Sequence, residues 1–297
     1  MRTILAKGID VSKHQGRIDW EKVAKAGIEF VMIRVGYRGY SNGKIVLDPY
    51  FKENIAGALA NGIKVGIYFF STAISVAEAE EEARWTLEQI KGYDVTYPIV
   101  FDYEGFELKK YRSYGTNRTQ RTAFNKAFNA IVKKAGFKTM IYGSKGNIMS
   151  TYDIASLGEK LWCARYSGGY NRILDDDKYF PAIVGYEIAM WQYTSIGRVD
   201  GIKGNVDMNY LYIDMEKEEV KEEAKTEESE VYDMPTIKRG SKGKLVKVWQ
   251  VIVGATVDGS FGAKTEKATK EWQKKNGLTV DGIVGKNSWE AGLKSLL

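Results

Sequence analysis

The sequence predicts an α/β fold, an irregular (β/α) TIM-like barrel followed by a small three-helix module. Short apolar, β-branched runs alternate with amphipathic stretches over the first 215 residues, and eight such runs occur. An internal repeat follows in the last 60 residues. A doubly wound open sheet is the structural alternative, but the sequence offers no dinucleotide-binding glycine fingerprint for it.

Each predicted strand is a short run rich in Val, Ile, Phe and Tyr, bounded by glycine, proline or polar turn residues. The eight runs cover residues 4–10, 30–35, 65–70, 97–105, 137–142, 161–166, 188–193 and 206–212. This number of strands is that of a (β/α) barrel, and the later connections look irregular.

Helix signals lie between these runs. Asp19 is predicted to cap the first helix, and Asp48 to cap the second with Pro49 in its first turn. Ser75 and Glu78 form the pattern of a capping box before a third helix. The predicted apolar stripe of this third helix includes Val76, Ala83, Leu87 and Ile90. The clearest helix begins near residues 116–119 and ends at Gly136.

Two carboxylates end the strand at residues 97–105. Asp102 and Glu104 are two residues apart, so they project from the same face, roughly 7 Å apart along the strand. Close carboxyl groups raise each other's pKa, which suits glycoside hydrolysis by a proton donor and an acidic companion. Taken alone, an Asp-x-Glu pattern is more typical of a strand end or a turn.

Other residues are predicted to share the mouth of the barrel, where catalytic groups lie at the carboxyl ends of strands. Asp10 ends the first strand, whereas Asp207 lies near the start or middle of the last strand. Aromatic residues recur at or near strand ends, where they could stack on sugar rings: Tyr68, Tyr142, Tyr166 and Trp191. Each ring singly is expected in the core, and only their recurrence indicates a sugar-binding cleft.

The single cysteine and the single histidine exclude several kinds of site. One cysteine, Cys163, allows no internal disulfide, and one histidine, His14, cannot supply a zinc site with several imidazoles. A Cys163–His14 thiol dyad stays formally open, but Cys163 lies in an apolar run typical of a buried cysteine. We expect His14 at the edge of the cleft or on the surface, and neither a cofactor nor a metal.

Charge is distributed unevenly. Residues 216–233 carry nine acidic and three basic side chains, whereas residues 237–297 carry twelve basic and five acidic ones, and the whole chain has a net charge of +6. We therefore predict a basic catalytic domain at 1–215, an acidic flexible linker at 216–235 and a basic module at 236–297. Two basic bodies favour a polyanionic partner, but no nucleic-acid motif accompanies the charge, so nucleic acid is not expected.

No membrane insertion is expected, because no apolar run is long enough to span a bilayer. The apolar run at the start of the chain is too short for a signal peptide. If the protein acts outside a cell, another factor must therefore release it.

The C-terminal repeat comprises residues 256–262 and 279–285, each containing Val-Asp-Gly before a short amphipathic helix. Trp249, Trp272 and Trp289 occur once per helix, so we expect them to form the packed centre of the module. Each copy has one Asp, which is too few oxygen ligands for a calcium loop. A module of this size is expected to bind rather than catalyse.

Five motifs, in order, resemble those of glycoside hydrolase family 25, the lysozymes that cut after N-acetylmuramic acid. They are residues 8–16 (GIDVSKHQG), 102–104 (DYE), 161–166 (LWCARY), 190–193 (MWQY) and 206–209 (VDMN). The tail resembles the peptidoglycan-binding module type 1, through residues 239–243, 248–250, the Val-Asp-Gly repeats and 288–289. Trp249 and Trp272 depart from the Leu and Phe usual there, which bears on the module's ligand.

The resemblance implies a muramidase that hydrolyses the β-1,4 bond between N-acetylmuramic acid and N-acetylglucosamine, of the phage endolysin type. It implies that Glu104 is the general acid and then base, and that Asp102 orients the N-acetyl group that attacks the anomeric carbon. Asp10 and Asp207 would line the cleft floor, and Tyr68 would lie beside the reacting sugar. The sequence leaves a protein nucleophile open as the alternative to substrate assistance.

The implied partners are bacterial peptidoglycan and anionic cell-wall polymers. The resemblance also implies synthesis in the host cytoplasm without a signal peptide, and action on the cell wall after release. Two alternatives remain at this stage: a wall-binding protein that no longer cleaves its substrate, and a glucosaminidase or chitinase of the same fold.

Overall fold

The computed structural model describes residues 2–169, 171–215 and 234–294. The chain divides into two compact units, Met1–Glu222 and Glu223–Leu297. The predicted acidic linker lies outside the described residues except for Met234 and Pro235. Its boundaries with the two domains therefore stay a prediction.

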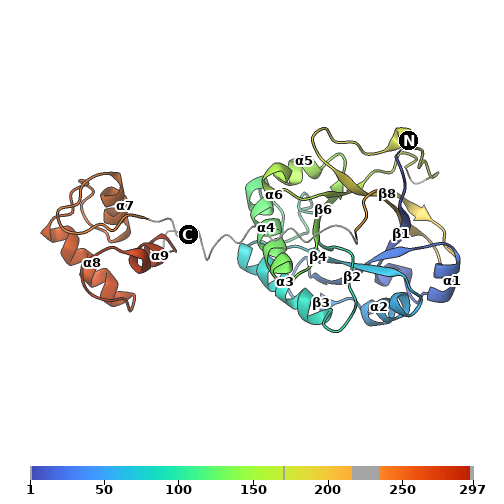
Figure 1. Cartoon of the computed structure of the whole chain (residues 1–297), viewed down its shortest axis with the longest axis horizontal. Helices are drawn as coiled ribbons and strands as arrows, with labels where there is room; N and C mark the ends of the chain where they lie inside the picture. The colour runs from blue at the N-terminus through green and yellow to red at the C-terminus, as the bar shows by residue number, and fades with distance from the viewer. Residues whose placement is uncertain (1, 170, 216–233, 295–297) are drawn as a thin grey trace. The chain divides into compact units, whose positions relative to one another are not determined.

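The first unit is a closed barrel of eight strands surrounded by helices (Figure 1). The barrel strands are β1 (Ala6–Val11), β2 (Phe30–Arg38), β4 (Lys64–Ser71), β5 (Ile99–Tyr103), β6 (Thr139–Ser144), β7 (Leu161–Ala164), β8 (Ile188–Gly197) and β9 (Val206–Leu211). The ring closes because β1 pairs with β2 on one side and with β9 on the other. The predicted barrel of eight strands is confirmed, and a short ninth strand, β3 (Ile45–Leu47), forms a hairpin with β2 outside the ring.

The last barrel strand departs from the parallel pattern. Strand β9 is antiparallel to both β8 and β1, whereas the other neighbours in the ring are parallel. The cause is the short connection between Gly197 and Val206, because a parallel return needs a crossover of about a dozen residues or more. As a result, the amino end of β9 lies at the same rim as the carboxyl ends of the other strands.

Helices cover the outside of the barrel (Figure 1). They are α1 (Trp20–Lys25), α2 (Phe51–Ala60), α3 (Val76–Gln89), α4 (Arg118–Lys134), α5 (Ile148–Thr151) and α6 (Ile154–Leu157), with single 3-10 turns at Lys13–Gln15 and Asp177–Tyr179. The later connections are irregular, as predicted: α5 and α6 are short, and the described residues between β7 and β8 form no helix other than a 3-10 turn.

Some helices begin with the capping residue that the sequence predicts, and one does not. Asp19 caps α1 and Ser75 caps α3 as predicted, and Asn117 forms a capping box with Gln120 at α4. Asp48 does not cap α2, which begins at Phe51 without a side-chain cap.

The predicted apolar stripe of α3 is also wrong in part. Val76 is exposed, and the buried side chains of this helix are Ala79, Glu82, Ala83 and Thr86.

The strands separate two apolar cores, because neighbouring side chains on a strand point to opposite faces. On β5, Ile99, Phe101 and Tyr103 belong to the core between strands and helices, whereas Val100 belongs to the core inside the barrel. The inner core contains Phe30, Met32, Val100, Met140, Trp162 and Met190. It closes the interior below the rim, so the space at the carboxyl ends of the strands is a cleft rather than a channel.

The second unit contains α7 (Lys244–Ile252), α8 (Ala263–Lys275) and α9 (Lys286–Lys294). The three predicted tryptophans meet at its centre, where the Trp249 ring lies 5.1 Å from Trp272 and 5.2 Å from Trp289, between centroids.

The sequence repeat in this unit is also a structural repeat. Gln250 donates to Asp258 Oδ1 at 2.8 Å and accepts from the Gly259 backbone, and Gln273 does the same with Asp281 and Gly282. Each Asp-Gly turn is therefore held by a buried glutamine of the preceding helix.

Within the described residues, we find no helix with the length and apolar character needed to cross a membrane.

Candidate active site

Four carboxylates meet in one cleft at the mouth of the barrel. Asp102 lies near the end of β5 and Glu104 directly after it, and Asp10 lies near the end of β1. Asp207 pairs directly opposite Asp10 across the antiparallel β1–β9 ladder, so both side chains point the same way. The cleft has a volume of about 360 Å³, and all four acids line it.

The structure places three of the four predicted aromatic residues in this cleft and excludes the fourth. Tyr68, Tyr142 and Tyr166 line it. Trp191 is fully buried on the other face of β8, where its ring packs against Phe180. Its predicted contact with substrate is therefore wrong, and the physical reason is strand alternation: its neighbours on β8 face inward and Trp191 does not.

The cleft also contains residues that were not predicted: Ser12, Gln15, Arg34, Phe70, Trp162 and Gln192. Two of them carried a signal in the sequence, because Arg34 and Gln192 are polar residues inside apolar strand runs. A charged or amide side chain in such a run is costly unless it meets a polar partner. His14 lies at the cleft as well, in agreement with the expected edge position.

Arg34 is held by a buried acid. Asp48 Oδ2 accepts from both Nε and Nη2 of Arg34, at 2.9 and 2.7 Å, and from the Lys13 backbone at 3.0 Å. Asp48, predicted to be a helix cap, is thus the counter-ion that keeps a cation at the cleft wall.

A hydrogen-bond network fixes Asp10 from the side of β8 and β9. Gln192 Nε2 and Asn209 Nδ2 both donate to Asp10 Oδ2 at 2.8 Å. The hydroxyls of Tyr142 and Tyr166 donate to Gln192 Oε1 at 3.0 and 2.6 Å, which fixes the orientation of the amide. The floor of the cleft is therefore preorganised before any ligand enters.

The cleft raises the pKa of both acids of the Asp-x-Glu pair. Burial raises the pKa of Asp102 well above its usual range, and the charge of Glu104 adds to this while Arg34 opposes it. Glu104 is exposed at the rim, yet the cleft walls raise its pKa, and the charges of Glu107 and Asp207 raise it further. A carboxyl group that holds its proton toward neutral pH can serve as a general acid.

The other two acids also hold protons more strongly than usual. Burial and the charge of Asp207 raise the pKa of Asp10 well above its ordinary value, partly offset by the bonds from Gln192 and Asn209. Burial raises the pKa of Asp207 to about 6, against a hydrogen bond from Tyr166. The four acids therefore titrate as a coupled group, in which the charge of one sets the protonation of the next.

One carboxylate oxygen of Asp102 has no hydrogen-bond donor among the described residues. Within the part of the chain that the structure describes, its Oδ1 is buried and makes no hydrogen bond to the protein, although the residue lines the cleft. A buried acceptor left unpaired costs about 1–3 kcal/mol, so a ligand that brings an N–H or O–H donor to this atom is favoured.

Cys163 is fully buried, and burial raises the pKa of its thiol to about 12. The interpretation of this residue as a buried cysteine is confirmed. A thiol that stays protonated at neutral pH is a poor nucleophile, which removes the thiol dyad as a functional alternative.

Comparisons with known proteins agree with this geometry. Residues 9–202 match the family model Glycosyl hydrolases family 25, and residues 248–291 match a model of a peptidoglycan binding domain. The uncharacterized protein YegX of Escherichia coli strain K12 is 30% identical over 205 residues, 68% of each chain. Lysozyme M1 of Streptomyces globisporus is 26% identical over 220 residues, 68% of this chain and 66% of the relative.

A solved structure supports the fold. The modular autolysin LytC from Streptococcus pneumoniae, in complex with a synthetic peptidoglycan ligand, superposes with a TM-score of 0.58 at 26% identity. The superposition covers 70% of this chain and 46% of LytC, so this chain spans less than half of that protein.

Proposed function

Because this chain belongs to glycosyl hydrolases family 25, we propose that it is a muramidase. It hydrolyses the β-1,4 bond between N-acetylmuramic acid and N-acetylglucosamine in bacterial peptidoglycan. The observation that carries the proposal is the meeting of four carboxylates in one cleft at the barrel mouth, with Glu104 at its open rim. Two named relatives support the substrate, since one is a lysozyme and the other was solved with a peptidoglycan ligand.

Glu104 acts as the general acid. Its raised pKa keeps a proton available for the glycosidic oxygen, so that the bond to the anomeric carbon breaks without release of an alkoxide. The same carboxylate then takes a proton from the water that attacks the anomeric carbon, which restores the starting state.

Asp102 positions the substrate beside this donor. Its unpaired Oδ1 can accept the N–H of the acetamido group and hold the acetamido oxygen toward the anomeric carbon. Asp10 and Asp207 line the floor beneath, and Tyr68 lies beside the reacting sugar, with Tyr142 and Tyr166 on the β6–β8 side. The contribution of Asp102 is then orientation and stabilisation of the positive charge that develops in the transition state.

The C-terminal module attaches the enzyme to its insoluble substrate. Its match to a peptidoglycan binding domain supports peptidoglycan as the ligand, and its basic charge suits anionic wall polymers as additional partners. A catalytic barrel with a wall-binding module is the organisation that a phage endolysin needs to cleave the cell wall of its host and so lyse the cell.

Mass spectrometry of the fragments released from purified walls tests the function. Muramic acid at the new reducing end is the expected result. N-acetylglucosamine at that end would instead establish a glucosaminidase, and the absence of new reducing ends would establish a wall-binding protein without turnover.

Removal of the module is expected to separate binding from catalysis. A chain of residues 1–215 should keep its rate on soluble peptidoglycan fragments but bind purified walls roughly 10-fold less well or weaker, because the tether is lost. Pelleting with walls measures the binding. Equal pelleting of the truncated and full chains would remove the anchoring role.

Glu107→Gln is expected to shift the pH dependence of the reaction. The charge of Glu107 raises the pKa of Glu104, so its removal lowers that pKa and Glu104 loses its proton at lower pH. The alkaline limb of the kcat/KM profile on soluble fragments should move to lower pH, with the maximal rate preserved. Glu53→Gln is the control, since Glu53 is exposed on α2, 3.9 Å from Arg17. An alkaline limb that stays in place in Glu107→Gln would mean that Glu104 does not set it.

A further inference from the structure

Three aromatic rings from three separate segments form a row at the rim of the cleft. Phe70 of β4 lines the cleft, and the Tyr111 ring lies 6.5 Å from it, between centroids. The Tyr40 ring of the β2–β3 hairpin lies 5.2 Å from Tyr111 on the outer side. Tyr40 is 52% exposed, so the row leads from the cleft to the surface.

The middle ring of this row, Tyr111, lies next to the proposed acid. Gly105, directly after Glu104, has a φ of 73°, and a Cβ added there would lie 3.0 Å from Tyr111 Cε1. Burial raises the pKa of Tyr111. The charge of Glu104 raises it further, and by more than the charge of Asp102 does. The ring therefore covers the backbone that carries Glu104.

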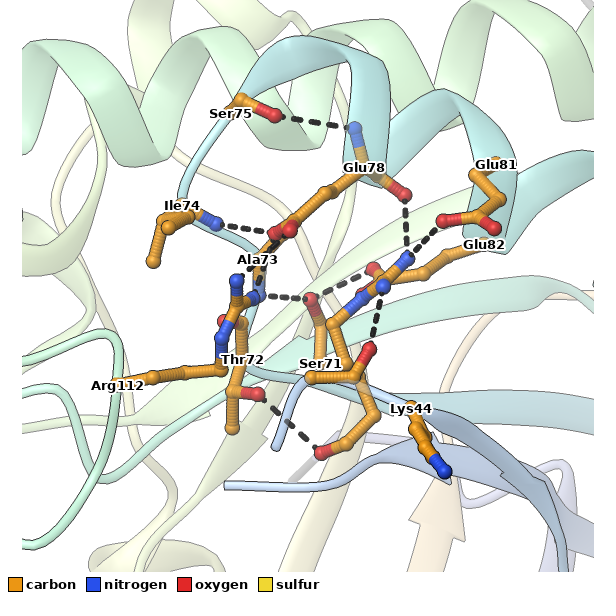
Figure 2. A network of polar contacts seen from close by, with 12 residues as sticks. Lys44, Ser71, Thr72, Ala73, Ile74, Ser75, Glu78, Glu81, Glu82 and Arg112 are labelled. Carbon is orange, nitrogen blue, oxygen red and sulfur yellow. Dashed lines mark hydrogen bonds and ion pairs between the residues drawn. The ribbon is translucent and has the colours of Figure 1, made fainter. Parts of the chain in front are cut away.

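A partly buried network holds this segment in place. The Arg112 guanidinium donates to both carboxylate oxygens of Glu78, at 2.6 and 2.8 Å, and to the Thr72 carbonyl at 3.1 Å. Figure 2 shows Arg112 reaching Glu78 at the start of α3. The Arg112 backbone N–H donates to the Tyr40 carbonyl at 2.7 Å, which ties the two tyrosine-bearing segments together.

We propose that Tyr111, together with Phe70 and Tyr40, forms a further sugar-binding subsite for the pyranose ring on the leaving-group side of the scissile bond. The inference rests on the proposed function, and on Glu104 as the donor to the leaving oxygen. A ring beside that donor is placed to stack on the apolar face of the departing sugar. Phe70 lines the cleft, whereas Tyr111 and Tyr40 lie beyond its lining residues, so the row extends the cleft rather than duplicating its floor.

The test compares two substrates with and without a sugar in this subsite. The first is a set of soluble glycan strands, and the second is an aryl glycoside of N-acetylglucosaminyl-N-acetylmuramic acid, whose leaving group is a phenol. In the full chain, Tyr111→Ala should lower kcat/KM on strands about 10-fold and leave the aryl glycoside unchanged. Tyr111→Phe should retain both rates, because the ring is kept.

Tyr114→Ala is the matched control, since Tyr114 is 51% exposed on the same loop and lies outside the row of rings. It should leave both rates unchanged. Equal losses on both substrates for Tyr111→Ala would mean that the ring acts on Glu104 or on the fold, and no loss on either would mean that it contacts no sugar. Both outcomes overturn the proposal.

A binding measurement keeps this test separate from the catalytic assignment. Calorimetric titration of uncleaved strands into the Glu104→Gln chain, with and without Tyr111→Ala, should show about 10-fold weaker binding in the double variant. The C-terminal module contributes equally to both chains. Equal affinities of the single and double variants would overturn the subsite, even if the unchanged chain cleaves walls. Weaker binding by the double variant would support the subsite, even if Glu104 proves not to be the acid.

Discussion

Glu104→Gln is expected to lower the rate of wall clearing about 1,000-fold. Glutamine keeps the size of the side chain but has no proton to give to the glycosidic oxygen, so the leaving group must depart as an alkoxide. A loss of this size corresponds to about 4 kcal/mol in the activation barrier. Turbidity loss of purified walls and release of reducing ends measure it.

Wall binding should survive the same substitution. The module of residues 234–294 belongs to a separate compact unit, and nothing in its core changes. Pelleting of Glu104→Gln with walls should therefore equal that of the unchanged chain. Glu107→Gln is the matched control, because it makes the same chemical change three residues away and should keep the maximal rate. Clearing by Glu104→Gln at the unchanged rate would overturn the assignment of the acid.

The barrel and the pair of acids at the end of β5 could be predicted because both depend on local patterns. Apolar runs bounded by turn residues mark strands wherever both faces are buried. Asp102 and Glu104 follow at a strand end, where the fold gathers its functional groups. The spacing within one segment predicted that the two acids lie on the same face, whereas their catalytic roles came from the resemblance to a known family.

The position of Asp207 at the mouth of the barrel depends on the length of the connection between β8 and β9. A residue near the start of a parallel strand would lie at the bottom of the barrel, far from Asp102. The short link between β8 and β9 reverses the last strand and carries Asp207 to the mouth. The predicted strands ended at residue 193 and began at residue 206, a gap long enough for a crossover, so the short link appears only because β8 extends to Gly197.

Strand alternation means that only one of the neighbours Trp191 and Gln192 can face the inside of the barrel. Once Asp10 is placed inside the barrel, its register with β9 and the register of β9 with β8 place Gln192 on the inside too. Trp191 then faces the helices. Strand alternation together with this register would have replaced Trp191 by Gln192 as the predicted cleft residue.

Partners distant in the sequence could not be predicted. Arg34 meets Asp48, and Arg38 meets Glu82 of α3, through contacts that exist only after the strands and helices pack. A buried charge in an apolar pattern signals that a partner must exist, but the pattern does not identify it.

Arg38→Met is expected to destabilise the barrel increasingly as the pH rises above neutral, by up to about 3–5 kcal/mol. Glu82 is fully buried, and its carboxylate accepts from Arg38 Nε at 2.6 Å and from the Ser71 hydroxyl at 2.7 Å. Figure 2 shows Glu82 and its neighbour Glu81 within this network. Without the guanidinium, ionisation of Glu82 would leave a buried charge that Ser71 alone cannot balance.

The loss should depend on pH in a defined direction. Burial raises the pKa of Glu82 from 4.5 to about 7, with Ser71 and Arg38 lowering it, so removal of Arg38 raises it further. The folded state then binds more protons than the unfolded state above pH 4.5, and stability falls as the pH rises through 7. The difference between the variant and the unchanged chain should therefore be small near pH 5.5, where Glu82 is protonated in both.

Scanning calorimetry of the barrel transition at two pH values measures this effect. Arg84→Met is the matched control, because Arg84 lies on α3 and pairs with Glu80 at 2.6 Å, but the pair is exposed and should contribute below about 1 kcal/mol. A loss of equal size at both pH values would show that Arg38 acts through packing or its bond to the Gly43 carbonyl rather than through the charge of Glu82. The double variant with Glu82→Gln should recover stability at high pH, since no buried charge is then left without a partner.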